Sequence, residues 1–300
     1  MKKTAICFAF IICAGFLQAS EFKILAKTYF DAPNPGAIKS KSQIYYMPKV
    51  LQPAGSLPYF QALTYPGGAP RRRLKVSLTA EGYDGTGNAL SFEKTNGKET
   101  MILCSKICEG EKKLLTSKKD LYVAFCIYSK ENSGAYFLTF RNNTQKKNRK
   151  FGIKLPGGKW HVIKQRINGP NFFNPGDLVN SIGVYNCGLM VRNWQIDNFV
   201  VWQGIDKEAP TQVKDIEIKK DKDNNLIKWK AAKDNIFVKN YKIYRGTVKS
   251  FKPDKTCFVG ETNKLFFVNQ ALMPHKYFYI IVAEDINGNC STPSVAVSDK

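Results

Sequence analysis

The sequence predicts an all-β protein built from two successive β-sandwiches, and three observations carry that prediction. Short alternating or apolar runs recur along the chain, and residues 20–206 contain no amphipathic helix of any length. Turn-forming pairs such as Asn96-Gly97 and Ser133-Gly134 separate the runs. The chain has 300 residues, which is enough for two domains that each bury a core.

Residues 1–19 have the features of a secretory signal peptide. Lys2 and Lys3 precede an apolar run from Ala5 to Leu17, and Ala19 supplies a small residue for cleavage. The run is too short to span a bilayer, and no later run is long and apolar enough to do so. Acylation of Cys13 is an alternative, although the bulky residue before it fits such a site poorly. We therefore expect an exported protein that is secreted, periplasmic or held at the cell surface.

Residues 20–206 predict a two-sheet sandwich or jelly roll. About ten strand-like runs follow one another at the spacing that such folds require. We expect these strands at residues 22–29, 73–80, 88–94, 99–105, 121–129, 134–141, 150–155, 159–167, 179–186 and 194–202.

The segment from Pro33 to Pro70 has a different composition, with seven prolines and several aromatic residues. We expect a long loop here that does not pair regularly, either a rim loop or a functional surface. Aromatic faces stack on sugar rings and arginine pairs with sulfate or carboxylate, so this loop and the basic cluster after it are candidate ligand-binding residues. The alternative is that the tyrosines pack the loop and the arginines are solvated. The candidates are Tyr45, Tyr46, Tyr59, Tyr65, Arg71, Arg72 and Arg73.

Four short motifs in this part of the chain resemble the carbohydrate-binding and galactose-binding-like jelly rolls of bacterial secreted proteins. They are residues 29–36 (YFDAPNPG), 81–92 (EGYDGTGNALSF), 158–160 (GKW) and 196–201 (IDNFVV). The resemblance implies a jelly-roll fold and a glycan ligand. Related domains often hold a structural Ca²⁺ near the first and last strands, which makes Asp31 and Asp197 candidate ligands. The alternative is that each carboxylate caps a turn; no other cofactor is expected.

Residues 227–289 carry the second resemblance. Their strand and turn motifs, which include Ile227-Lys228-Trp229 and Asp285-Ile286-Asn287-Gly288-Asn289, are similar to the signature of the bacterial fibronectin type III module. A polar linker at residues 203–210 precedes it, so we expect domains at residues 20–206 and 207–300. The resemblance places Trp229 and Tyr241 in the second core.

The charge is strongly positive and unevenly distributed. The chain has 46 Lys and Arg against 24 Asp and Glu, a net charge of +22. Residues 20–206 hold 27 basic and 13 acidic side chains, an excess of 14, whereas residues 207–300 hold 17 and 11, an excess of 6. Such a field attracts anionic polymers, including sulfated or uronic polysaccharides, although it can also serve only solubility. No nucleic-acid recognition motif is present, so nucleic acid is not an expected partner.

Catalytic residues are not expected. The chain has two histidines, His161 and His275, and it lacks nucleophile-elbow, zinc-protease and phosphate-loop motifs. Its carboxylates are scattered rather than paired on one strand as a jelly-roll glycosidase would require. A strand at Gly183-Val184-Tyr185-Asn186 is faintly similar to one of a polysaccharide lyase, but the accompanying Gln and His strand is missing. Six cysteines follow the signal, and we expect mostly structural thiols and at most one disulfide.

The sequence therefore favours an exported, non-catalytic carbohydrate-binding protein, with an anionic polysaccharide or a cell-surface glycan as its ligand. One alternative is a structural or adhesive surface protein in which both domains are spacers. Another is a jelly-roll polysaccharide lyase or glycoside hydrolase.

Overall fold

The protein is all-β throughout the part of the chain that the computed structural model describes, which confirms the predicted fold class. The described residues are 22–28, 37–40, 43–46, 59–65, 74–79, 81–94, 99–105, 115–116, 120–131, 135–142, 144–169, 172–174, 176–186, 193–221, 224–270 and 276–298. No helix in these ranges has the length and apolar character needed to cross a membrane.

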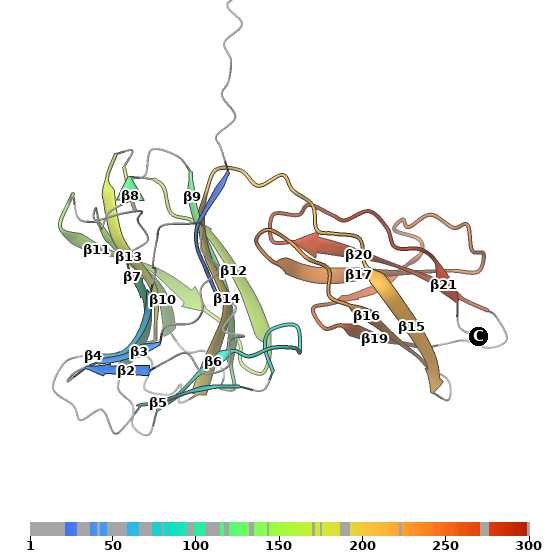
Figure 1. The fold of residues 1–300 in the computed structure, drawn as a ribbon, viewed down its shortest axis with the longest axis horizontal. Coiled ribbons are helices and arrows are strands. Elements are labelled where there is room, and N and C mark those ends of the chain that lie inside the picture. The colour runs from blue at the N-terminus through green and yellow to red at the C-terminus, as the bar shows by residue number, and fades with distance from the viewer. Residues whose placement is uncertain are drawn as a thin grey trace, which may run out of the picture.

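The first fourteen strands form two antiparallel sheets, which together make the N-terminal sandwich (Figure 1). The six-stranded sheet has the order β12-β9-β14-β6-β5, with β1 paired to β14, and the eight-stranded sheet has the order β11-β10-β13-β7-β4-β3-β2, with β8 paired to β13. The chain crosses between the sheets repeatedly, as in a jelly roll. The strands are β1 (Lys23–Thr28), β2 (Ala37–Ser40), β3 (Gln43–Tyr46), β4 (Tyr59–Tyr65), β5 (Leu74–Leu78), β6 (Leu90–Lys94), β7 (Glu99–Ser105), β8 (Leu115–Thr116), β9 (Leu121–Ser129), β10 (Ala135–Asn142), β11 (Lys147–Lys154), β12 (Trp160–Arg166), β13 (Leu178–Asn186) and β14 (Asn193–Gln203).

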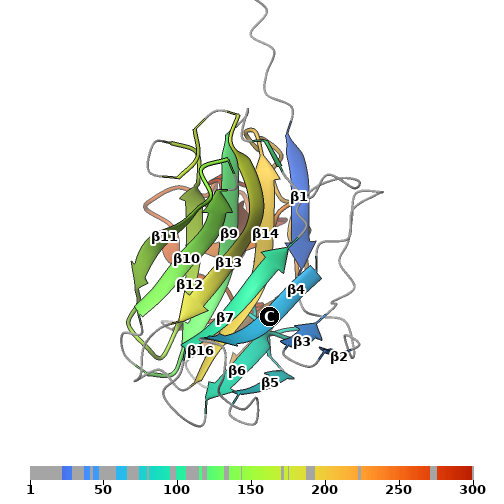
Figure 2. The same ribbon diagram turned by 90° about the vertical axis from the view of Figure 1, so that its left-hand side faces the viewer.

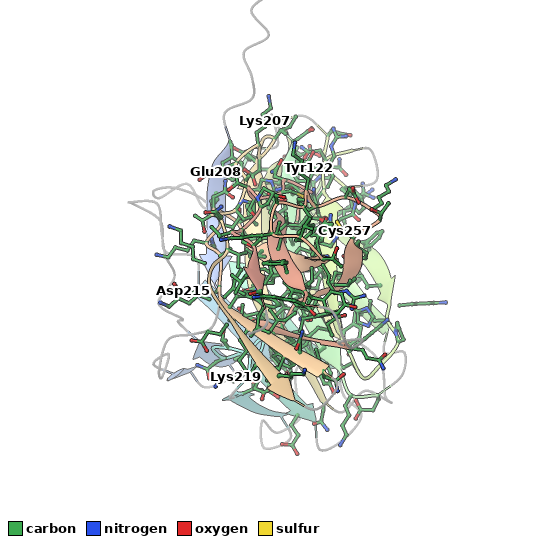
Figure 3. The ribbon with its side chains drawn as sticks, turned by 90° about the vertical axis from the view of Figure 1, so that its right-hand side faces the viewer. Tyr122, Lys207, Glu208, Asp215, Lys219 and Cys257 are labelled. Carbon is green, nitrogen blue, oxygen red and sulfur yellow. The ribbon has the colours of Figure 1, made fainter. Side chains whose placement is uncertain are left out.

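The last seven strands form a second pair of sheets, the C-terminal sandwich. A three-stranded sheet has the order β15-β16-β19, and a four-stranded sheet has the order β18-β17-β20-β21. Figure 3 shows this end of the molecule, with Asp215 and Lys219 on β15 and the linker residues Lys207 and Glu208 near one end. The strands are β15 (Lys214–Asp221), β16 (Asn224–Lys230), β17 (Val238–Gly246), β18 (Phe258–Thr262), β19 (Phe266–Gln270), β20 (Phe278–Asp285) and β21 (Val297–Ser298).

Each sandwich encloses its own apolar core. The N-terminal core includes Trp194, which stacks on Phe92 with ring centroids 4.2 Å apart. The C-terminal core contains Trp229 and Tyr241, 5 % and 3 % exposed, with ring centroids 5.3 Å apart. The expectation that these two residues lie in the second core is confirmed.

The expectation that the Pro33–Pro70 segment cannot pair regularly is wrong. Strands β2, β3 and β4 arise from it and extend the eight-stranded sheet, with Tyr45 opposite Gln61. The prolines lie outside these strands, because a proline has no N–H to donate to a ladder. The high proline content of the segment therefore led to the short strands between the prolines being missed.

The six-stranded sheet is the layer between the eight-stranded sheet and the C-terminal sandwich (Figure 1). A third apolar cluster fills this junction and joins Cys126 and Trp202 of the sheet to Ile236, Phe237 and Ile286 of the C-terminal sandwich. The two sandwiches therefore pack directly against each other through apolar side chains.

Hydrogen bonds fix the same junction. The buried Lys27 donates from Nζ to the carbonyl oxygen of Asn235 at 2.6 Å. The Tyr83 hydroxyl donates to the carbonyl oxygen of Lys239, also at 2.6 Å. Both bonds join a side chain of the N-terminal sandwich to the backbone of the C-terminal one, so they specify a single relative placement rather than general adhesion.

Among the described residues, Cys126, Cys257 and Cys290 are free thiols. Cys126 is buried on β9, which agrees with the expectation of a thiol acting as a small apolar side chain. Burial raises the pKa of this thiol well above its usual value.

Candidate functional site

The register of the eight-stranded sheet assigns aromatic positions from strands far apart in the sequence to its outer face. Figure 2 shows this face toward the viewer, away from the C-terminal sandwich. Directly opposed residues of neighbouring strands share one face of a sheet, so the register decides which positions lie outside. Ile182 and Val184 of β13 are fully buried in the core, so the positions that alternate with them, such as that of Tyr185, belong to the outer face.

Two outer-face rows follow from the register. In one, Phe137 of β10 lies opposite Tyr185 of β13, which in turn lies opposite Met101 of β7. In the next row, Leu103 of β7 lies opposite Gln61 of β4, which lies opposite Tyr45 of β3. The positions of Tyr59 and Tyr65 on β4 have the same parity as Gln61 and share its face.

The structure brings three of the four predicted tyrosines to one face and assigns the fourth to the other. Tyr46 lies opposite Phe60, on the face that looks toward the core. The cluster Arg71, Arg72 and Arg73 lies outside the described residues. Whether any of these residues binds a ligand stays a prediction.

Sequence reasoning missed Phe137 and Tyr185 as outer-face residues. Their strands alternate between buried and outer positions, since Tyr136, Leu138 and Val184 are fully buried. That period of two was a usable signal, but it does not show which strands are neighbours. One edge of the same sheet is basic, because Lys150 and Lys154 on the edge strand β11 are exposed.

The predicted calcium ligands do not form a pair that the structure describes. Asp31 lies outside the described residues. Asp197 is 4 % exposed, and its Oδ2 accepts the N–H of Tyr83 at 2.8 Å while its Oδ1 accepts the N–H of Asn198 at 2.7 Å. Asp197 therefore organises the turn that begins at Gly82; calcium binding by these two aspartates stays a prediction.

Gly82 is required by that arrangement. A Cβ atom on residue 82 would lie 2.6 Å from the carbonyl oxygen of Thr86 and 2.8 Å from Oδ2 of Asp197. Both distances are shorter than real Cβ contacts, and one neighbour is backbone. The motif Glu81–Asn88 is thus a turn folded around a buried carboxylate.

A different set of carboxylates could hold a cation. Asp206 of the linker, Asp234 and Asp285 each present an oxygen within 4.8 Å of the other two. Amide donors already surround two of them: Asp206 accepts from Asn235 Nδ2 at 2.8 Å, and Asp285 accepts from the N–H of Asn289 at 2.8 Å. The sequence signal was present as Asp-Asn and Asp-x-Asn-Gly-Asn, but these motifs are also ordinary turn formers.

Asp234 differs from its two neighbours. Its Oδ2 accepts the N–H of Ile236 at 2.8 Å, whereas its Oδ1 is inaccessible to solvent and accepts no hydrogen bond from the residues that the structure describes. Burial, reinforced by the charges of Asp285 and Asp206, raises the pKa of this carboxyl to about 6, although its hydrogen bond and Lys27 oppose the shift. Burial lowers the pKa of Lys27 to about 8.

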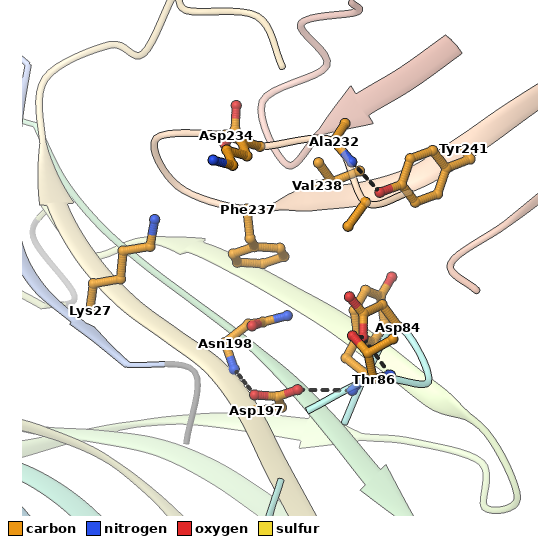
Figure 4. Close-up of a pocket in the computed structure, with 13 residues that line it drawn as sticks. Lys27, Asp84, Thr86, Asp197, Asn198, Ala232, Asp234, Phe237, Val238 and Tyr241 are labelled. Atoms are coloured by element: carbon orange, nitrogen blue, oxygen red, sulfur yellow. Dashed lines mark hydrogen bonds between the residues drawn. The ribbon is translucent and has the colours of Figure 1, made fainter. Parts of the chain in front are cut away.

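A cavity of about 500 Å³ lies beside Asp234, between the two sandwiches (Figure 4). The N-terminal sandwich contributes Asp84 and Asn198, among other residues, and the C-terminal sandwich contributes Phe237 and Tyr241. Asn198 stands at a β-bulge of β14 and has a φ of 51°, a left-handed conformation that asparagine tolerates. Asn198 is one of the residues that line the cavity.

The structure describes one of the two histidines, His161. Its Nε2 lies 2.9 Å from the carbonyl oxygen of Pro156, which is a local contact at the start of β12. The second histidine, His275, lies outside the described residues.

Comparisons with known proteins do not assign a family. No protein-family model matches the chain, and no curated protein matches it. The fibronectin type III resemblance therefore stays a prediction.

Among solved structures, the Endo-D glycoside hydrolase domain from Streptococcus pneumoniae is 10 % identical, with a TM-score of 0.41 over 91 % of this chain and 42 % of that chain. This chain thus spans less than half of that protein. The family 11 carbohydrate-binding module of a cellulosomal cellulase from Clostridium thermocellum is 15 % identical, with a TM-score of 0.34 over 51 % and 91 % of the two chains. A xylan-binding domain from Paenibacillus barcinonensis is 10 % identical, with a TM-score of 0.38 over 63 % and 97 %. Similarity at this level carries no argument about this chain.

Proposed function

We propose that this protein is an exported, non-catalytic carbohydrate-binding protein whose binding surface is the outer face of the eight-stranded sheet. One observation carries the proposal. The register places Phe137, Tyr185 and Tyr45 on one face, in two neighbouring rows, with Tyr59 and Tyr65 at further positions of that face. Aromatic residues at positions that share one face, of which Phe137 and Tyr185 are direct neighbours, can stack on sugar rings of an extended polysaccharide.

The basic edge of the sheet supports an anionic ligand. Lys150 and Lys154 are exposed on β11, and Thr139, which lies opposite Lys150, continues the row toward the outer-face positions. An ammonium group attracts sulfate or uronic carboxylate on a polymer lying across the face. Exposed pairs of this kind contribute little individually, roughly 0.2–1 kcal/mol each, so they select the ligand more than they hold it.

A glycan array with neutral, uronic and sulfated polysaccharides tests the proposal, using the wild type and a Phe137→Ala/Tyr185→Ala double variant. We expect saturable binding by the wild type and a loss of about tenfold or more in the variant, which corresponds to about 1.4 kcal/mol. Phe266→Ala is a matched control, because Phe266 is an exposed aromatic residue, 46 % accessible, on the C-terminal sandwich. A protein that serves only as a spacer would bind nothing on the array.

The proposed preference for an anionic ligand has a separate test. Affinity for sulfated or uronic glycans should fall as salt rises, because exposed charges are screened beyond about 8–10 Å at physiological ionic strength. Replacing Lys150 and Lys154 with serine should lower that affinity about threefold and leave neutral glycans unaffected. Release of unsaturated or reducing sugars from any bound polymer would instead favour the lyase or hydrolase alternative.

A further inference from the structure

The six-stranded sheet carries partly exposed side chains just beyond the apolar cluster of the junction. Phe125 and Ile127 of β9 pack in the N-terminal core. Cys126 and Tyr128 alternate with them and therefore belong to the opposite face of the sheet. Cys126 lies in the cluster that joins the two sandwiches, whereas Tyr128, two residues further along the strand, is partly exposed.

Four residues form one row across this face. Trp160 of β12 lies opposite Tyr128 of β9. Tyr128 lies opposite Gln195 of β14, which in turn lies opposite Ser91 of β6. All four side chains are partly exposed. The row crosses three strand spacings of about 4.8 Å, roughly 14 Å in total, which is enough for a short oligosaccharide.

The aromatic end of the row is held in place by its neighbours. The ring centroids of Tyr128 and Trp160 are 5.7 Å apart, with the rings tilted by 48°. The ring of Tyr83 meets that of Trp160 edge-on, at 6.0 Å and 88°. Tyr83 is itself fixed, because it donates its N–H to Oδ2 of Asp197 at 2.8 Å and its hydroxyl to the carbonyl oxygen of Lys239 at 2.6 Å. An aromatic pair that is already ordered loses little freedom when a ligand stacks on it.

The other end of the row can donate and accept hydrogen bonds. The side chains of Gln195 and Ser91 make no hydrogen bond to the residues that the structure describes, and neither has a buried polar atom without a partner. An amide offers two donors and an acceptor, and a hydroxyl group offers one donor and two acceptors. A sugar ring has an apolar face and a polar edge, so an aromatic pair beside an amide and a hydroxyl group is suited to bind it.

The row itself is uncharged, and the charges around it have both signs. The charged residues that adjoin it along the strands or in the loop at Tyr83 are Lys130, Lys159, Lys264, Asp84, Glu93, Glu131 and the buried Asp197. Their fields largely offset one another, so they do not favour an anionic ligand in the way that the basic edge of the eight-stranded sheet does.

We propose that this row is a second carbohydrate site, which binds one or two units of an uncharged glycan. Trp160 and Tyr128 stack on the apolar face of a sugar ring, and Gln195 and Ser91 bond its hydroxyl groups or those of the next ring. The inference rests on the proposed function for the class of ligand, but it uses the other sheet of the N-terminal sandwich (Figures 1 and 2). A protein with both sites can hold two glycan chains at once.

The four tryptophans of the chain give this site a selective optical signal. Trp194, Trp202 and Trp229 are 0 %, 1 % and 5 % exposed, whereas Trp160 is partly exposed. Acrylamide quenches the fluorescence of indoles that it can reach, so it should quench mainly Trp160. A sugar that stacks on this ring should protect it from acrylamide.

Acrylamide quenching and isothermal titration of the full chain test the proposal. The panel contains glucose, galactose, mannose and xylose, their β-linked disaccharides, and glucuronate as the anionic comparison. We expect at least one neutral sugar to bind saturably, to protect the tryptophan fluorescence and to keep its affinity as salt rises. Affinity should fall about tenfold in Tyr128→Ala, which loses a stacking ring, and about fivefold in Gln195→Ala, which loses a hydrogen bond.

Two controls accompany these variants. Gln165→Ala is matched to Gln195→Ala, because Gln165 lies opposite the core residue Val123 and donates to the carbonyl oxygen of Arg166 at 2.7 Å, on the other face of the same sheet. It should bind as the wild type does, and so should the Phe137→Ala/Tyr185→Ala variant. Circular dichroism and urea unfolding show whether each variant is folded.

Three outcomes would overturn the inference: no neutral sugar binds, a bound sugar leaves acrylamide quenching unchanged, or folded Tyr128→Ala and Gln195→Ala both bind as tightly as the wild type. Stronger binding of glucuronate that weakens steeply with salt would overturn the choice of an uncharged ligand. Binding that is lost only in Phe137→Ala/Tyr185→Ala would assign the sugar to the outer face of the eight-stranded sheet. Failure of the glycan array on that face leaves protection of Trp160 intact, because different variants change the two surfaces.

Discussion

Replacing Asp234 with asparagine should stabilise the protein at neutral pH and lose that advantage in acid. The carbonyl of the new amide can still accept the N–H of Ile236, which now bonds Oδ2 at 2.8 Å. Its NH₂ group replaces an oxygen without a donor, and it lies near the oxygens of Asp206 and Asp285, which are acceptors. One buried negative charge is removed from a cluster of three.

The magnitude follows from the pKa. Burial, with the charges of Asp285 and Asp206, raises the pKa of Asp234 from 3.8 to about 6. A shift of about two units is about 3 kcal/mol at 1.36 kcal/mol per unit, and partial solvent exposure of the side chain reduces this to about 1–2 kcal/mol. We expect a gain of that size in the free energy of unfolding at pH 7.

The direction of this pKa shift determines how the stability difference between the two proteins depends on pH. Because the folded pKa is raised, the folded protein holds this proton more tightly than the unfolded chain between about pH 4 and pH 6. The penalty is therefore absent below about pH 4, grows as the pH rises through that window, and is complete above about pH 6. The asparagine variant lacks this titration, so its advantage should shrink toward zero as the pH falls to 4.

Urea unfolding of both proteins at pH 4, 5, 6 and 7, in EDTA, measures the difference. Titrating groups far from residue 234 cancel, whereas Asp206, Asp285 and Lys27 interact with its charge and contribute to the difference. A variant that is less stable than the wild type at pH 7, or an advantage that stays constant down to pH 4, would refute the reasoning. The same measurement in CaCl₂ is the control for a bound cation, since binding to the folded state alone would stabilise the wild type and not the variant.

Three further substitutions test the turn, the junction and the second core, each by urea unfolding. Gly82→Ala should cost about 1–3 kcal/mol, because its Cβ would lie 2.6 Å from the carbonyl oxygen of Thr86; a neutral effect would contradict the close approach. Tyr83→Phe removes only the hydroxyl that bonds Lys239 across the junction at 2.6 Å, so a loss of about 1 kcal/mol is expected, and a stabilised variant would count against that bond. Trp229→Ala should cost about 3–5 kcal/mol because the side chain is 5 % exposed in the C-terminal core, and a cost below 1 kcal/mol would place the indole outside that core.

Strand positions were predictable from the sequence because alternation and turn residues are local signals. The expected run at residues 121–129 coincides with β9, and the run expected at 99–105 coincides with β7. Short strands between prolines, β2 and β3, were missed, since four residues give too little alternation to detect.

The candidate sites were less predictable because they depend on strand neighbours and on the packing of two sandwiches. Phe137 and Tyr185 lie in different strands, and only the ladder between β10 and β13 brings them together. The cavity required Asp84 and Asp234, which are 150 positions apart, to line the same space. Local patterns contain no information about either arrangement.

The burial pattern of β9 reflects the fact that both faces of this strand are covered. Its run Leu121–Tyr128 is apolar on both faces, and the pattern is buried at nearly every position, whereas an antiparallel sheet with one solvated face would alternate. One face of β9 packs in the N-terminal core through Val123, Phe125 and Ile127. The other presents Ala124 and Cys126 to the junction with the C-terminal sandwich.

Strand β10 of the eight-stranded sheet has one covered face and therefore alternates. Fully buried Tyr136 and Leu138 on β10 alternate with positions that belong to the outer face. The C-terminal sandwich covers the six-stranded sheet and lies away from this outer face (Figures 1 and 2). The continuously apolar strand β9 thus belongs to the six-stranded sheet, which packs against the second sandwich. The alternating strand β10 belongs to the eight-stranded sheet, whose outer face we propose as the polysaccharide-binding surface. The two kinds of hydrophobic pattern in one sandwich therefore distinguish the sheet that packs against the second sandwich from the sheet whose outer face we propose for a ligand.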